Sequence, residues 1–103
     1  MPAWTFLTDH AHVLVLLARD PRGDVPALAE ATGLDVPTVA RILTDLQEAG
    51  YVRRDHRGDV TYTTIDRAKP LRHPIEAHHP VGRLLDAVQS PADVLRGRLA
   101  GTD

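Results

Sequence analysis

Residues 25–52 read VPALAEATGLDVPTVARILTDLQEAGYV and carry the clearest structural pattern of the chain. This pattern predicts two short helices joined by a tight turn and followed directly by a strand. Gly33 is placed to end the first helix in a left-handed conformation. Asp35 is placed to accept hydrogen bonds from the first free N–H groups of the second helix, which runs over residues 36–49 and stops at Gly50.

The second of these helices has an apolar side with the i, i+3, i+4, i+7 spacing that faces a core. The members of this side are Val39, Ile42, Leu43, Leu46 and Ala49. Outside it, the N-terminal half of the helix carries small or basic residues, namely Pro37, Thr38, Arg41 and Thr44. Side chains of this kind can enter the major groove of DNA. The two helices and their turn are therefore typical of a helix-turn-helix.

Another helix is predicted before this stretch. Thr8 or Asp9 can cap it, and it runs up to the Pro21-Arg22-Gly23 stop. Residues 13–18 are apolar on every side of this helix. Such a helix is usually covered from two directions, either by two elements of its own domain or by one element and a partner chain.

A β-hairpin is predicted directly after the helix-turn-helix. The runs Tyr51–Asp55 and Val60–Ile65 are rich in β-branched and aromatic residues, and residues 56–59 between them hold Gly58 at the turn. Within the second run, alternate residues share a face, so one face can pack on the helices. The sequence therefore predicts a mainly α fold with a β-hairpin (α+β).

The remainder of the chain is predicted to add helices to this unit. Three prolines interrupt residues 66–80, which indicates a connection over the surface. A helix follows with Val81, Leu84, Leu85 and Val88 on one side, and Ser90-Pro91 begins a last helix that contains Val94, Leu95 and Leu99. We expect one structural domain, with a winged helix-turn-helix over residues 1–72 and a helical extension over residues 73–103.

Composition narrows the function further. The net charge of −2 argues against nonspecific coating of nucleic acid, yet residues 37–72 hold seven basic against five acidic side chains. The chain has no cysteine, and its start lacks the features of a signal peptide, so we expect a cytoplasmic protein without a membrane role. The spacing of the six histidines does not favour a metal site. No catalytic motif is present, so we expect neither an enzyme nor a cofactor.

The segment LAEATGLDVPTVARILTDLQEAGYVRRD, residues 28–55, resembles the DNA-binding core of the bacterial MarR and ArsR superfamily of transcription regulators. The resemblance covers residues 4–65 and implies a winged helix-turn-helix with recognition helix 36–49 and wing 53–59. It also implies that a wing arginine reaches a neighbouring minor groove. This chain departs from the family in its short, half-acidic wing and in lacking the thiolate ligands of the metal-sensing branch.

Candidate DNA contacts follow from the exposed helix face and the wing: Pro37, Thr38, Arg41, Thr44, Arg53, Arg54 and Arg57. Arg41 can pair with the O6 and N7 atoms of guanine. The alternative is a solvated Arg41 paired with Asp45 at i+4. Thr38 and Thr44 can touch phosphate or a thymine methyl group, or can simply be solvated.

One recognition helix contacts few base pairs, so we expect a homodimer on a pseudo-palindromic DNA site. The apolar residues left for its interface are Val13, Leu16, Leu17, Leu84, Leu85, Val88 and Leu95. The alternative function is a winged-helix module that binds another protein without specific DNA binding. The sequence gives no indication of a small-molecule effector.

Overall fold

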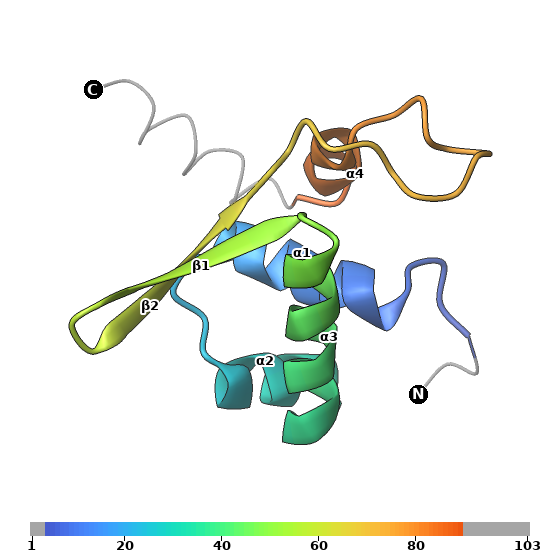
Figure 1. Cartoon of the computed structure of the whole chain (residues 1–103). Helices are drawn as coiled ribbons and strands as arrows, with labels where there is room; N and C mark the ends of the chain where they lie inside the picture. Colours follow the sequence, from blue (N-terminus) through green and yellow to red (C-terminus); the bar gives the residue numbers. More distant parts are fainter. Residues whose placement is uncertain (1–3, 90–103) are drawn as a thin grey trace.

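The computed structural model describes residues 4–89 and contains six of the seven predicted helices and strands. They are, in order, α1 (Asp9–Arg19), α2 (Val25–Thr32), α3 (Val36–Glu48), β1 (Val52–Arg57), β2 (Val60–Ile65) and α4 (Val81–Ala87). The hairpin projects from one side of the helices (Figure 1). The mainly helical α+β prediction is confirmed. The predicted last helix from Ser90 lies outside the described residues.

Local capping explains where the first three helices begin. The side chains of Thr8, Asp24 and Asp35 each accept a hydrogen bond from the backbone N–H three residues further on, at 3.1, 2.9 and 2.8 Å. Each such bond satisfies one of the N–H groups that a helix start leaves unpaired. Gly33 ends α2 with a φ of 77°, in the left-handed region. The predicted starts of α1 and α3 and the predicted end of α2 at Gly33 are therefore confirmed, while α3 ends at Glu48, one residue before the predicted end.

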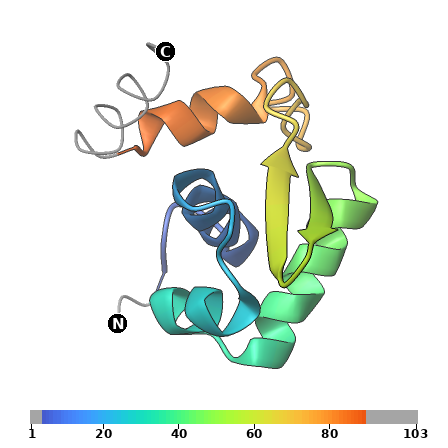
Figure 2. The same ribbon diagram turned by 90° about the vertical axis from the view of Figure 1, so that its left-hand side faces the viewer.

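The core lies between the helices and is closed by the start of the hairpin. Figure 2 shows α1 in the middle, with α2 and α4 on opposite sides of it, and α1 also contacts α3. The most completely buried side chains come from α1, α3 and α4: Val13, Leu17, Val39, Ile42 and Leu85. Two elements of the same chain, or one element and a partner chain, were the predicted ways of covering α1, and the structure shows the first, because α2, α3 and α4 all contact it.

The hairpin turn is tighter than predicted. β1 and β2 pair antiparallel from Val52 opposite Ile65 to Arg57 opposite Val60. The turn is therefore Gly58-Asp59, and the predicted four-residue turn at 56–59 is wrong. Gly58 has a φ of 63°, which lets the chain reverse within two residues. Arg57 consequently ends a strand and does not sit on the turn.

The connection from β2 to α4 is held by paired backbone segments. The Lys69 carbonyl accepts from the Val81 N–H at 2.8 Å, and the Arg67 carbonyl accepts from the Gly82 N–H at 2.9 Å. Arg67 also forms an ion pair with Asp86 on α4. A Cβ atom on Gly82 would lie 2.9 Å from the Arg67 carbonyl oxygen, so only glycine fits there without a shift. These contacts attach α4 to the hairpin side of the core.

Thr63 offers a test of the hairpin's packing. Its side chain is buried, and its hydroxyl has no hydrogen-bond partner among residues 4–89. An unpaired buried polar group costs free energy, so Thr63→Val should raise the free energy of unfolding by about 1 kcal/mol in urea titrations. Thr64→Val, on the exposed face of the same strand, controls for strand propensity. A loss of stability in Thr63→Val alone would show that the hydroxyl is satisfied.

Candidate nucleic-acid interface

The exposed side of α3 carries most of the predicted helix contacts. Pro37, Arg41 and Thr44 are exposed, whereas Thr38 is half-buried. The opposite side of the helix is buried in the core and holds Val39, Ile42, Leu43 and Leu46. The amphipathic division predicted for this helix is therefore confirmed.

Thr38 is engaged within the chain. Hydrogen bonds from its hydroxyl and from its backbone N–H hold the pKa of the Asp35 carboxyl below its usual value, and the positive charge of Arg41 adds to this effect. The carboxylate is thus stabilised in its charged form at the N-terminus of α3, where negative charge is also favoured by the helix dipole. Thr38 therefore takes part in capping the helix, through its backbone N–H at 2.8 Å from Asp35 Oδ1.

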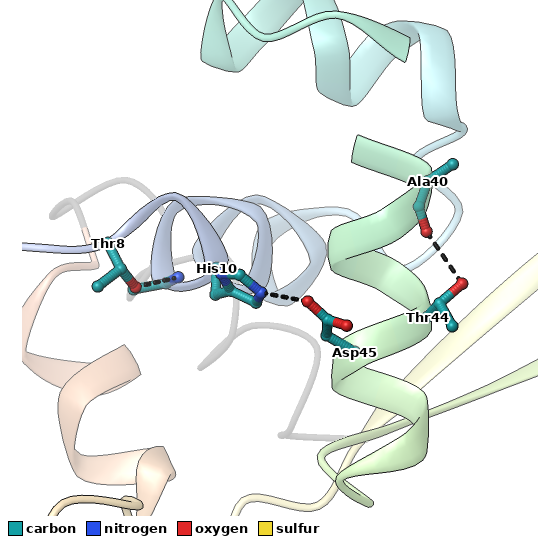
Figure 3. Close-up of polar contacts among 6 residues, drawn as sticks. Thr8, His10, Ala40, Thr44 and Asp45 are labelled. Carbon is teal, nitrogen blue, oxygen red and sulfur yellow. Dashed lines mark hydrogen bonds and ion pairs between the residues drawn. The ribbon is translucent and has the colours of Figure 1, made fainter. Parts of the chain in front are cut away.

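Asp45 contacts α1. Its Oδ2 atom lies 2.8 Å from Nε2 of His10, and both side chains are partly exposed. Figure 3 shows His10 and Asp45 pointing toward one another between the two helices, while Thr44 lies on a different side of α3. The alternative ion pair between Arg41 and Asp45 is not formed. Among residues 4–89 the Arg41 side chain has no carboxylate partner within ion-pair distance.

The hairpin separates the three wing arginines. Arg53 and Arg57 lie on the outer face of β1, and Arg54 lies on the opposite face, since it pairs in register with the buried Thr63. Arg53 forms a 3.2 Å ion pair with Asp55, which offsets its charge. The guanidinium of Arg57 lies over the Tyr62 ring at 5.1 Å from its centroid. Arg57 is therefore the most available cation of this face, and Arg54 is directed away from it.

In the N-terminal part of α3, between Val36 and Thr44, two exposed residues were not among the predicted contacts. Val36 is 47% exposed although its spacing from Leu43 suggests a core position, because it is the first residue of the helix. Ala40 is also exposed, between Val36 and Thr44 at intervals of four residues. That i, i+4 spacing was the signal in the sequence that could have identified Ala40.

The predicted dimer residues divide into buried and accessible ones. Val13, Leu17 and Leu85 are buried in the chain's own core, so they present no surface to a second copy. Leu16 and Val88 remain half-buried and line one groove of about 400 Å³. Leu84 lines a separate pocket of about 330 Å³. Leu95 lies outside the described residues.

Three helices followed by a β-hairpin, with the third helix exposed, define a winged helix-turn-helix. Residues 11–56, from α1 to the penultimate residue of β1, match the family model of the IclR helix-turn-helix domain. This match supports DNA binding in transcription regulation, a role without enzymatic activity. It points to the IclR type, so the resemblance to MarR and ArsR regulators holds only for the winged helix-turn-helix. No curated protein sequence matches the chain.

A metal-binding cluster and a membrane-spanning helix are both absent from the described part of the chain. Residues 4–89 bring together no group of three or more histidine, aspartate or glutamate side chains suited to a metal ion. None of the helices within those residues has the length and apolar character needed to cross a bilayer.

Proposed function

We propose that the chain is a sequence-specific transcription regulator that binds double-stranded DNA as a homodimer. In this proposal α3 enters the major groove, and the outer face of the hairpin contacts the adjacent backbone or minor groove. The observation that carries it is the position of Arg41. It stands on the exposed face of α3 without a carboxylate partner in residues 4–89, because Asp45 is paired with His10.

The charge distribution supports contacts at a few defined positions. The whole chain has a net charge of −2, so general attraction to phosphate is weak. On the exposed N-terminal part of α3, between Val36 and Thr44, Arg41 is the sole charged residue. Arg57 adds a cation on the outer hairpin face. Binding at such isolated positions favours recognition of a particular sequence over coating of any DNA.

Selection of bound sequences from random duplex DNA tests this function. The selected sequences should contain a palindrome whose half-sites are about 34–36 Å apart, the spacing of two helices that enter successive major grooves. The selected duplex should also outcompete unrelated DNA at physiological salt. If no sequence is enriched, the proposed function as a sequence-specific regulator is wrong.

The hairpin makes a separate prediction about salt. Arg57→Ala should reduce the slope of log affinity against log salt concentration by about one unit, because one phosphate contact is lost. The loss should be similar for specific and unrelated duplexes. Arg54→Ala, on the opposite face of the same strand, is the matched control and should leave the slope nearly unchanged. Equal slopes for Arg57→Ala and the unmodified protein would place the hairpin outside the interface.

We propose that the homodimer forms around the groove lined by Leu16 and Val88. Five of the eight residues that line the groove are apolar, because Leu7, Val15 and Ala31 join Leu16 and Val88, and the other three are His12, Arg19 and Thr32. Apolar surface of this kind is typical of homodimer interfaces. Sedimentation from low to high micromolar concentration measures the association, and a monomer throughout that range would exclude this dimer.

A second candidate function is supported by an exposed aromatic pair. Trp4 and Phe6 are 68% and 92% exposed, and their rings meet edge to face with centroids 5.0 Å apart. Phe6 also lines the pocket that contains Leu84. Exposed aromatic side chains beside an apolar pocket favour a protein partner. This docking function becomes the better candidate if the DNA selection enriches nothing.

A further inference from the structure

Between Val36 and Thr44, the exposed side chains of α3 other than Arg41 offer few groups that can donate hydrogen bonds. Val36, Ala40 and Thr44 follow one another at intervals of four residues, so they lie along one line of the helix surface. Pro37, beside this line, has no N–H group. Arg41 is the only charged side chain between Val36 and Thr44. The line therefore offers mainly methyl groups to a ligand.

Thr44 belongs to this apolar line because of its hydrogen bond. Its hydroxyl donates to the carbonyl oxygen of Ala40 at 3.1 Å, within the same helix (Figure 3). The donor is thus occupied by the backbone, and the methyl group is the part of the side chain left for a contact. Of the alternatives for Thr44, this bond disfavours donation to phosphate and favours contact with another methyl group.

We infer that α3 recognises thymine through its C5 methyl group, with Val36, Ala40 and Thr44 as the specificity-determining residues. This inference rests on the proposed function and specifies the kind of DNA sequence that the helix reads. In the major groove, thymine differs from cytosine and the purines by this methyl group, and small apolar side chains are its usual partners. Arg41, beside the line, supplies a bidentate contact for guanine. The preferred half-site accordingly combines thymines with a guanine.

Deoxyuridine substitution in the selected duplex tests the methyl contact directly. Uracil pairs like thymine and lacks only the C5 methyl group, so shape and hydrogen bonding are preserved. At each contacted thymine the substitution should weaken binding about fourfold, the factor expected for one buried methylene-sized group. Thymines elsewhere in the duplex should tolerate it. A second comparison replaces the T·A pair at a contacted position by a C·G pair. The duplex with 5-methylcytosine at that position should bind more tightly than the duplex with cytosine, by a similar factor.

Variants then connect each methyl group to a side chain. For Val36→Ala, deoxyuridine substitution at one thymine position should no longer change the affinity. Substitution at the other contacted thymines should still weaken binding. Ile75→Ala removes a large exposed apolar side chain from the β2–α4 connection and is the matched control, with all deoxyuridine effects intact. Circular dichroism of both variants establishes that they are folded.

The outcomes separate this inference from the proposed function. If a palindrome is selected and every deoxyuridine substitution leaves its affinity unchanged, methyl recognition is wrong and DNA recognition stands. If the deoxyuridine effects occur but are the same in Val36→Ala, Ala40→Gly and Thr44→Ser, these three residues are not the readers. If no sequence is selected, the proposed function fails, and the inference fails with it.

Discussion

Arg41→Ala is expected to weaken binding to the selected duplex by about 10- to 100-fold, equivalent to roughly 1–3 kcal/mol for a bidentate contact to guanine. The side chain is exposed and forms no ion pair within residues 4–89, so its removal should leave the fold intact. Affinity for unrelated DNA should fall much less. Titrating the protein into each fluorescently labelled duplex measures the ratio of its affinities for the selected and the unrelated DNA.

Arg41→Lys distinguishes a base contact from a phosphate contact. Lysine keeps the positive charge and loses the planar fork that matches the O6 and N7 atoms of guanine. A base contact therefore predicts that Arg41→Lys keeps the salt dependence and loses discrimination at one guanine. If Arg41→Lys binds the selected duplex as tightly and as selectively as the unmodified protein, Arg41 contacts only the backbone.

The features that could be predicted from the sequence are those with local causes. Asp35, and Thr8 as one of two candidates, could be predicted as caps because the N–H groups that they satisfy lie three residues further along the chain. The buried side of α3 followed from helical periodicity. These local signals were sufficient to predict a winged helix-turn-helix.

The features that were missed depend on contacts between distant residues. Asp45 was considered as a partner of Arg41, yet it pairs with His10, which is 35 positions away on α1. Leu17 and Leu85 were expected at a dimer interface, yet the packing of α4 on α1 buries both within the chain. Apolar character predicts that a side chain is covered, but it does not identify which surface covers it.

Leu17 and its neighbour Leu16 should respond very differently to truncation. Leu17 is fully buried on the side of α1 that meets the core, and Leu16 lies in the groove proposed for the dimer. Leu17→Ala should lower the free energy of unfolding by about 2–5 kcal/mol, because it leaves a cavity among packed side chains. This is a large share of the roughly 5–15 kcal/mol that holds a domain folded. Urea unfolding at fixed protein concentration measures the loss.

Leu16→Ala should instead act on self-association. Its partial exposure limits the loss of monomer stability to about 1 kcal/mol, while the dimer dissociation constant should rise about tenfold, as for truncation of a buried interface leucine. Sedimentation measures the second effect and urea unfolding the first. If Leu16→Ala associates as tightly as the unmodified protein, the dimer interface does not lie at this groove. A Leu17→Ala variant as stable as Leu16→Ala would mean that α1 is not packed on α2, α3 and α4 as described, because only a poorly filled core could absorb that loss.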